Sequence, residues 1–170
     1  QTDLRNCEVF KQWDKVKDLR TKQEYEETRL LVAIRLQSLI KTAEQIVLND
    51  TLNSINLRAA NYLQRFFKNE ITASLVFERQ KIEMYLKLDG SETDINSLSG
   101  GEFARVVLAF AIAMAEMNNV KTLMLDESFA SLDAETTDNV LEAIKENYDG
   151  TIIIIAHQTT TGVFDQVIEI

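Results

Sequence analysis

Apolar residues at the start of the chain recur at helical spacing among dense charge. Residues 1–69 contain neither glycine nor proline, so nothing in this stretch forces a helix to end. Val16 and Leu19 lie three positions apart and Leu30 and Ile34 lie four apart, which favours one or two long helices of weak coiled-coil character. We expect residues 1–48 to form a coiled-coil helix, with an ordinary surface helix as the alternative.

A second helix is predicted after a polar break. Asn49-Asp50-Thr51 resembles a helix stop followed by an N-cap. The following helix is expected over residues 52–68. Its predicted buried residues are Leu52, Ile55, Leu57, Ala59, Leu63, Phe66 and Phe67.

The pattern then changes from helical spacing to alternation. Residues 71–77 and 82–88 place apolar side chains at every second position, which is typical of a half-buried antiparallel pair of strands. Asp89-Gly90-Ser91 is expected to form a turn. Residues 91–96 are a polar lead into the next element.

A serine and two glycines precede the most apolar helix of the chain. Residues 101–117 are apolar almost all round, which predicts a central helix. Ser99, Gly100, Gly101 and Glu102 stand at its start. Adjacent glycines allow close approach to a ligand, and helix N-termini favour phosphate. These residues therefore predict a phosphate-contacting loop, with a simple capped helix as the alternative.

Two short apolar runs follow, at residues 123–125 and 152–155, and both suit buried parallel strands. Between them, Asp133 is expected to cap a helix that extends to residue 147, with Gly150 ending it. Strand, helix and strand form a right-handed crossover unit. Residues 167–170 suggest one more strand. The fold class predicted is α/β, with a parallel sheet, flanking helices and a small antiparallel pair over residues 49–170.

Composition narrows the partners and the compartment. The 170 residues carry a net charge of −9; residues 1–70 hold 12 Lys/Arg against 10 Asp/Glu, and residues 71–170 hold 6 against 17. This acidity argues against broad nonspecific DNA binding by this part. A single cysteine and no visible signal peptide favour an intracellular protein. The longest apolar run is too short to cross a membrane. Beginning at Gln1, the chain is expected to be an excised fragment.

Four motifs in this order resemble the ABC-type ATPases. Leu98–Glu102 resembles the signature loop, and Leu123–Glu127, an apolar run ending in two acids, resembles the Walker B strand. Ser131-Leu132-Asp133 resembles the D-loop, and His157, which closes a run of four isoleucines, resembles the switch histidine. The resemblance covers roughly residues 96–160.

The resemblance implies ATP hydrolysis with Mg²⁺. Asp126, at the end of a strand where α/β sheets place ligands, is the expected Mg²⁺ partner, through water. Glu127 is expected to be the general base or to position the attacking water. His157 would sense the γ-phosphate and hold that water. Arg105, one turn into the helix, is a weaker candidate that neutralises a neighbouring acid.

The family resemblance also implies that two heads close on ATP as a homodimer. Ser99, Gly100, Gly101 and Glu102 would bind the ATP held by the other head. Ser131 and Asp133, in the D-loop, would lie at the dimer interface.

One ATPase motif is absent from the chain. No G-x-x-x-x-G-K-[ST] phosphate loop is present. The chain therefore resembles the C-terminal lobe of a head split by a coiled coil, as in the SMC and SbcC families, and an N-terminal lobe would complete its site. Residues 123–136, with the Asp-Glu-x-Phe-x-x-Leu-Asp-x-Glu-Thr shape, are most similar to SbcC-like repair ATPases.

The SbcC resemblance implies a nuclease subunit at the coiled-coil root, DNA ends as substrate, and double-strand-break repair. Three alternatives stay open: a chromosome-organising SMC ATPase, a transporter's nucleotide-binding domain, and a degenerate head that binds without hydrolysis. Intact Glu127 and His157 argue against the last of these.

Overall fold

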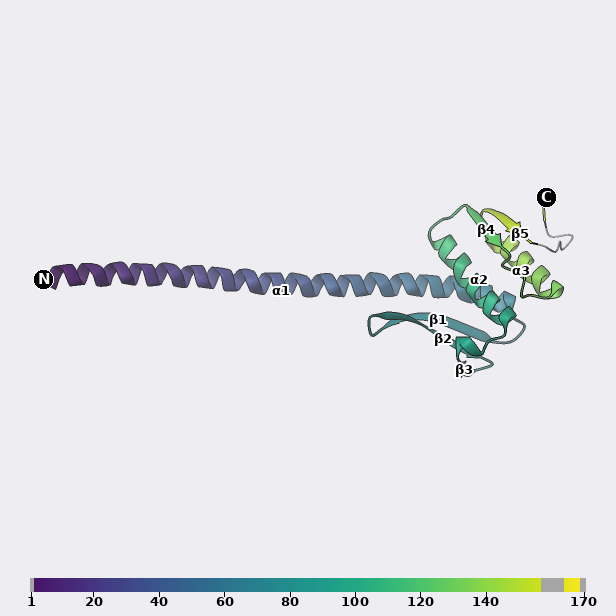
Figure 1. Ribbon diagram of the computed structural model, residues 1–170, viewed down its shortest axis with the longest axis horizontal. Coiled ribbons are helices and arrows are strands. Elements are labelled where there is room, and N and C mark those ends of the chain that lie inside the picture. The colour runs from purple at the N-terminus through teal and green to yellow at the C-terminus, as the bar shows by residue number, and fades with distance from the viewer. Residues whose placement is uncertain (1, 157–163, 169–170) are drawn as a thin grey trace. The chain divides into compact units, whose positions relative to one another are not determined.

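A computed structural model of the chain describes residues 2–156 and 164–168, with side chains from Phe10 onward. The chain divides into two compact units, residues 1–47 and 48–170, here called the N-terminal segment and the C-terminal unit. Helix α1 (Thr2–Phe66) supplies the whole described part of the first unit and the first helix of the second (Figure 1). Of the described residues, no helix has the length and apolarity needed to span a bilayer.

Helix α1 continues through the break predicted at Asn49-Asp50-Thr51, so the prediction of a second, separate helix is wrong. Asn and Asp inside a helix each cost only about 0.7 kcal/mol relative to Ala. Without a proline or glycine, that cost does not stop a helix whose next turns are packed in the core. Six residues on one face of the helix are buried there: Leu52, Ile55, Ala59, Tyr62, Leu63 and Phe66.

The prediction of a buried Leu57 is also wrong, since its side chain is 70% exposed. It lies two positions from both Ile55 and Ala59, on a different face of the helix. Tyr62, which the apolar pattern did not predict to be buried, lies in the same stripe, and its hydroxyl donates a hydrogen bond to Glu116 of helix α2 (Gly100–Met117). Burial, and then this hydrogen bond, raise the pKa of the Tyr62 phenol.

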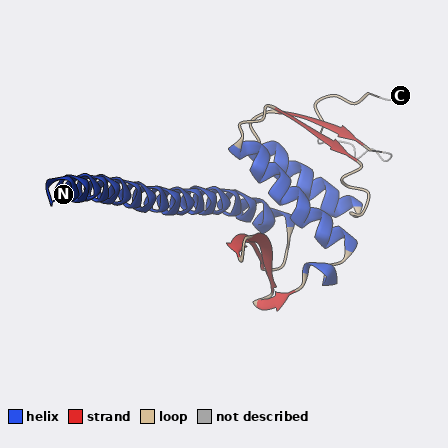
Figure 2. Cartoon of the chain, turned by 60° about the vertical axis from the view of Figure 1, so that its left-hand side comes forward, coloured by secondary structure: helices blue, strands red, loops and turns tan. Residues whose placement is uncertain are grey.

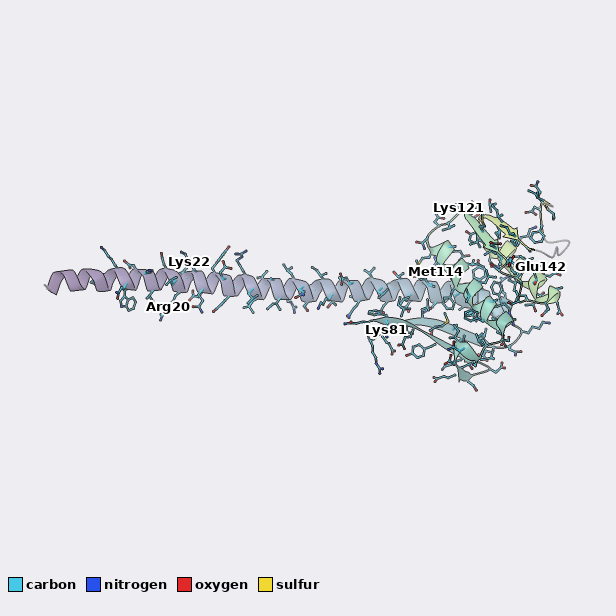
Figure 3. The ribbon with its side chains drawn as sticks, in the orientation of Figure 1. Arg20, Lys22, Lys81, Met114, Lys121 and Glu142 are labelled. Carbon is cyan, nitrogen blue, oxygen red and sulfur yellow. The ribbon has the colours of Figure 1, made fainter. Side chains whose placement is uncertain are left out.

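Every side chain from Phe10 to Val47 is exposed in this chain. Arg20 and Lys22 extend away from the helix in Figure 3. The ordered contacts are local, as where Arg29 pairs with Glu26 at 3.1 Å. Such pairs stabilise a helix by only a few tenths of a kcal/mol, so local contacts contribute little to this part of α1.

An antiparallel sheet follows α1. It contains β1 (Ile71–Glu78), β2 (Lys81–Leu88) and β3 (Ser91–Thr93), in that order. The predicted pair of strands is confirmed, with Ile71 opposite Leu88 and Glu78 opposite Lys81. The turn joining β1 to β2 is Arg79-Gln80, both with positive φ, the requirement of a type I′ hairpin.

One side chain of α1 binds the open edge of this sheet. The Asn56 amide nitrogen donates to the Leu75 carbonyl at 2.9 Å, and its amide oxygen accepts from the Leu75 N–H at 2.8 Å. Leu75 lies in β1, an edge strand. The amide therefore occupies both backbone groups that Leu75 presents away from β2.

The α/β part of the C-terminal unit begins with the short 3₁₀ helix η1 (Ile95–Ser97) and helix α2 (Gly100–Met117). Strand β4 (Thr122–Asp126), helix α3 (Ala134–Asn147) and strand β5 (Thr151–Ile155) follow. β4 and β5 are parallel, with Asp126 opposite Ile155, as predicted. In Figure 2 the two helices lie along one side of this strand pair.

The end of α3 differs from the prediction that Gly150 stops it. Tyr148 is the C-cap, donating its N–H to the Ile144 carbonyl at 2.9 Å. Gly150 lies beyond, where a Cβ would stand 2.7 Å from the Lys121 carbonyl oxygen. A glycine is therefore required at this position, because the residues just before β4 and just before β5 pack closely together.

The predicted strand over residues 167–170 is not formed in its described part, since residues 167 and 168 belong to no strand. Residues 169 and 170 lie outside the described residues.

The core of the C-terminal unit is centred on α2, as its nearly continuous apolar sequence predicts. Seven of its residues are buried: Val106, Leu108, Ala109, Phe110, Ile112, Ala113 and Ala115. They share one cluster with the buried face of α1, the inner face of α3 and Leu125 of β4. This packing holds the starts of α2 and α3 and the end of β4 in fixed relation.

Candidate nucleotide site

The signature-like loop is a closed capping box. Ser99 is the N-cap of α2, and its hydroxyl accepts the Glu102 N–H. The Glu102 carboxylate in turn accepts from the Ser99 N–H at 2.8 Å and from the Ser99 hydroxyl at 2.7 Å. The hydrogen bonds from the Ser99 side chain and backbone lower the pKa of Glu102. The capped helix is thus formed, and contact of these residues with a phosphate stays a prediction.

The glycine after this cap is required by a neighbour. A Cβ at Gly101 would stand 2.9 Å from the backbone oxygen of Ser131, closer than real Cβ contacts allow, whereas one at Gly100 would meet Ser131 at an ordinary 3.9 Å. Among the described residues the only glycine with positive φ is Gly90. Gly101 therefore permits close contact rather than an unusual turn. This contact brings the signature-like loop against the D-loop-like segment Ser131–Asp133.

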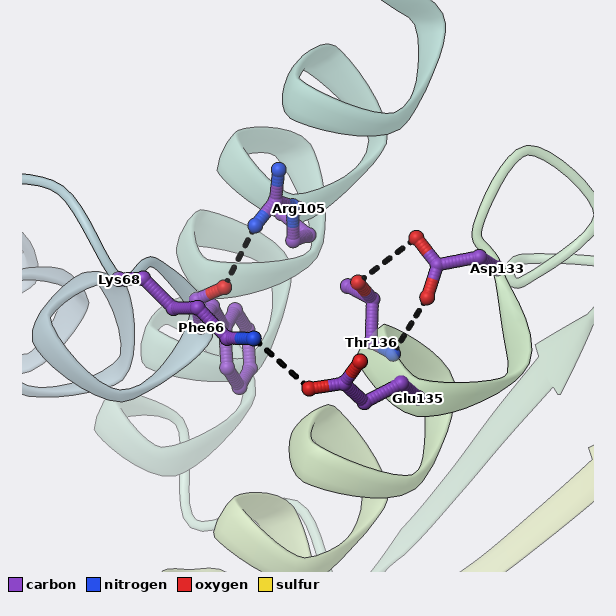
Figure 4. A network of polar contacts seen from close by, with 6 residues as sticks. All are labelled: Phe66, Lys68, Arg105, Asp133, Glu135 and Thr136. Atoms are coloured by element: carbon purple, nitrogen blue, oxygen red, sulfur yellow. Dashed lines mark hydrogen bonds and ion pairs between the residues drawn. The ribbon is translucent and has the colours of Figure 1, made fainter.

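Asp133 caps the next helix in the same way. Its carboxylate accepts from the Thr136 N–H at 2.8 Å and from the Thr136 hydroxyl at 3.0 Å (Figure 4). The hydrogen bonds from Thr136 lower the pKa of Asp133. The predicted cap is confirmed, and a role of Asp133 in a dimer interface stays a prediction.

The two adjacent acids at the end of β4 lie in different surroundings. Both acids are exposed, and Asp126 lies on the same face of the strand pair as Met124 and Ile153. Glu127 has a left-handed backbone with φ 48, and its N–H donates to the Ile155 carbonyl at 3.0 Å. Glu127 lines a cavity of about 210 Å³. The other residues lining it are Phe129, Ala130, Leu132, Ala134, Thr137, Leu141, Ile154, Ala156 and Phe164.

His157 lies outside the described residues, which stop at Ala156 directly after β5. Over residues 2–156 and 164–168 no group of three Asp, Glu, His or Cys side chains could hold a metal by itself. A single exposed carboxylate such as Asp126 fits Mg²⁺ brought by a nucleotide, because Mg²⁺ keeps several waters and takes its other oxygens from phosphates.

Arg105 has a larger structural role than the sequence suggested. Its Nη1 donates to the Phe66 carbonyl at 2.7 Å and its Nε to the Gly101 carbonyl at 3.2 Å. The guanidinium lies 4.0 Å from the centre of the Phe67 ring. Burial lowers the pKa of Arg105, while Glu102 and Asp133 act in the opposite direction. In the sequence, this role is indicated only by the position of Arg105, the one charged residue between Glu102 and Glu116 in an otherwise apolar helix.

No protein-family model matches the chain. It is 33% identical over 155 residues to the uncharacterised protein 050L of Invertebrate iridescent virus 6, a match that covers 80% of this chain and 15% of the viral protein. It is 32% identical over 110 residues to a probable Rad50 double-strand break repair ATPase of Aquifex aeolicus, covering 59% and 11%. A methionine import ATP-binding protein, MetN of Protochlamydia amoebophila, is 39% identical over 95 residues, covering 52% and 27%.

The chain thus spans a minor part of each of these relatives. It matches the Smc head domain with coiled coil and joint of Pyrococcus yayanosii with a TM-score of 0.69 and 23% identity, covering 81% of this chain and 28% of the other. This chain has the fold of part of an SMC ATPase head.

Two further solved heads have the same fold. The Smc head of Pyrococcus furiosus, bound to the C-terminal domain of ScpA, matches with a TM-score of 0.67 and 22% identity, covering 81% of this chain and 37% of that one. An SMC ATPase whose ATP-driven dimerisation has been described matches with a TM-score of 0.59 and 24% identity. The match covers 67% of this chain and 73% of that one. The predicted α/β fold with a helical N-terminal part is confirmed. Sequence similarity extends both to a Rad50 ATPase and to a transporter ATPase. The similarities therefore support this general type of ATPase head and do not single out the predicted SbcC family.

Proposed function

We propose that this chain is the C-terminal lobe of a split ABC-type ATPase head that hydrolyses ATP with Mg²⁺. The observation that carries the proposal is the contact of Gly101 with Ser131. It joins a capped helix start to the segment that follows Asp126 and Glu127. A helix N-terminus favours phosphate, and acids at the end of a buried strand suit a metal and a water. Such an arrangement supports phosphoryl transfer by positioning and charge neutralisation.

A missing partner lobe is supported by the parallel strand pair. Leu123, Leu125, Ile152 and Ile154 of β4 and β5 pack on the core. On the opposite face Met124 is 63% exposed, Ile153 41% and Ile155 50%. Parallel sheets are normally covered on both faces, and a two-stranded sheet is marginal alone. We infer that an N-terminal lobe carrying the phosphate loop covers this apolar face.

The residues of this chain then divide the work. Asp126 would hold Mg²⁺ through water, and Mg²⁺ supplies charge neutralisation at the phosphates. Glu127 would accept a proton from the attacking water, and His157 would orient that water. Ser99, Gly100 and Gly101 would contact the γ-phosphate held by a second copy of the head, with Glu102 keeping the loop in shape. Asp133 and Ser131 would lie at the interface of this dimer.

The biological setting we propose is a DNA repair complex in which a nuclease subunit acts on DNA ends. The similarity to a Rad50 repair ATPase supports it. A chromosome-organising SMC role is the second candidate, supported by the fold shared with Smc heads, one of them bound to ScpA. Co-purification from the native source separates the two, because a metallophosphoesterase partner favours repair and a kleisin-like partner favours the SMC role.

Calorimetric titration tests the split head. The chain alone should bind Mg·ATP only weakly, and addition of the N-terminal lobe should restore micromolar affinity. Micromolar binding by the chain alone would contradict the split. In the complete protein, Ser99→Arg should leave ATP binding nearly intact while ATP-driven dimerisation, followed by light scattering, is lost. Dimers that still form with this variant would refute the role in trans.

A further inference from the structure

The end of α1 lies beside the starts of both α2 and α3. Phe66 is the last residue of α1, and its carbonyl is one that a helix leaves without an intrahelical partner. Arg105 of α2 donates to this carbonyl, and Lys68, two residues further on, pairs with Glu135 of α3 at 2.7 Å (Figure 4). Two cations thus connect the end of α1 and the residues just after it to α2 and α3.

The two connections are built very differently. The side chains of Lys68 and Glu135 are 80% and 75% exposed, and pairs of this kind contribute about 0–1 kcal/mol. The Arg105 guanidinium is partly buried, stacked on the Phe67 ring and hydrogen-bonded to two carbonyls. A guanidinium holds several donors in one rigid plane, which a lysine cannot imitate. The Arg105 contact therefore fixes a geometry, whereas the Lys68 pair adds only charge.

One of the two carbonyls belongs to the signature-like loop itself. Gly101 lies so close to the Ser131 backbone that a Cβ would not fit, and its carbonyl accepts from Arg105. A displacement of the guanidinium would remove the only described side-chain hydrogen bond from outside the capping box to this first turn. The first turn of α2 would then keep its capping box and lose its connection to the end of α1.

We propose that Arg105 is a positioning residue that holds the signature-like loop ready for a phosphate by tying Gly101 to the end of α1. The inference rests on the proposed function, because it assigns the loop to the γ-phosphate of a second head. Arg105 itself touches no nucleotide. Its loss should slow turnover without changing Mg·ATP binding to the head's own site, because the phosphate loop expected to hold that nucleotide lies in the other lobe.

The test uses the full-length protein with both lobes. Arg105→Met keeps the length of the side chain and removes every donor, Arg105→Lys keeps the charge, and Lys68→Ala is the matched control on the neighbouring connection. We expect kcat of Arg105→Met to fall about 10²-fold, the usual effect of a small misplacement in an active site. KM for Mg·ATP should stay unchanged, and Lys68→Ala should match wild type in both constants.

Two further readouts separate positioning from simple loss of fold. Amide hydrogen exchange at residues 99–102, measured without nucleotide, should quicken in Arg105→Met and not in Lys68→Ala. Millimolar guanidinium should restore part of the turnover of Arg105→Ala, whereas equal urea should not. Wild-type kcat and wild-type exchange in Arg105→Met would overturn the inference, as would a loss of turnover that only follows the fraction of unfolded protein.

The proposed function fails in a different way. If the wild-type protein itself shows no ATP turnover, the ATPase proposal falls and takes this use of Arg105 with it. If wild type hydrolyses ATP and Arg105→Met does so equally well, the ATPase proposal stands and only the positioning role is lost.

Discussion

The acids at the helix starts and the acids at the strand end contrast sharply. Glu102 and Asp133 accept hydrogen bonds from the backbone of the first helical turn, which lower their pKa values. Asp126 caps nothing, and Glu127 adopts a left-handed backbone that costs a non-glycine residue roughly 1–2 kcal/mol. Folding accounts for the first two acids. Backbone strain clusters at functional sites, so the strand-end pair is where we place the chemistry.

The largest effect expected is on turnover by Glu127→Gln in the complete protein. The amide keeps the size of the side chain and removes the basic oxygen, so kcat should fall about 10²–10⁴-fold. Mg·ATP binding should persist, and the heads should accumulate as an ATP-closed dimer. Steady-state hydrolysis and size-exclusion chromatography with ATP would measure both.

Two companion variants make that result specific. Asp126→Asn should instead weaken the Mg²⁺-dependent part of ATP binding, because the two acids have different surroundings and cannot replace each other. Glu135→Gln, a change of the same size in the first turn of α3, should leave hydrolysis within a few-fold of wild type. Wild-type turnover by Glu127→Gln would reduce the strand-end pair to a strand terminus and remove the contrast.

The second effect concerns stability. Ser99→Ala removes the N-cap of α2 and should lower the free energy of unfolding by about 1 kcal/mol, the typical loss for a serine cap. Ser128→Ala is the control at the strand end, where the hydroxyl donates only to the Asp126 carbonyl at 3.3 Å, and should cost less. Urea unfolding of the two variants decides the matter, and equal losses would show that the helix start has no special role in stability.

A smaller effect, of opposite sign, is expected for Glu127→Gly. Relief of the left-handed backbone gains roughly 1–2 kcal/mol, while the freer unfolded chain costs about 0.4–1 kcal/mol. The protein should therefore become about 0.8 kcal/mol more stable in urea while losing hydrolysis. Asp126→Gly, in extended backbone, should destabilise. A less stable Glu127→Gly variant would mean that Glu127 contributes more to the fold than its strain costs.

The smallest effect is the pH dependence of the two caps. The pKa values of Glu102 and Asp133 are lower in the folded chain than their ordinary 4.5 and 3.8, so the unfolded chain binds more protons near those values. The stabilisation is present above them and is lost as pH falls through the folded pKa values. Glu102→Gln with Asp133→Asn, which still caps, should flatten the decline in urea midpoint between pH 5 and pH 3. An unchanged slope would assign the decline to other carboxylates.

Local patterns in the sequence predict much of this fold. Alternation gave β1 and β2, continuous apolar runs gave β4 and β5, and Asp133 with Ser99 gave two helix starts. Features set by tertiary packing escaped prediction. The break at Asn49 was overridden by the buried turns that follow it. The hairpin turn of Arg79 and Gln80 carries none of the usual turn residues.

The candidate site follows the same division. The helix caps at Ser99 and Asp133 could be predicted from the sequence, because a cap joins residues only three positions apart. The Gly101–Ser131 contact and the Arg105 bonds to Phe66 and Gly101 join residues 30 or more apart, or depend on which way a helix faces. No local pattern encodes them. His157, which lies outside the described residues, stays a prediction.

The amide of Asn56 has a consequence for how the protein behaves in a crowded solution. An exposed edge strand invites strands of other molecules to pair with it, which begins aggregation. By occupying both backbone groups of Leu75 in the middle of β1, Asn56 interrupts the row of free donors and acceptors that such pairing needs. The Asn56 amide thus opposes strand pairing between molecules at this edge. Asn56→Leu should increase the tendency of the protein to aggregate.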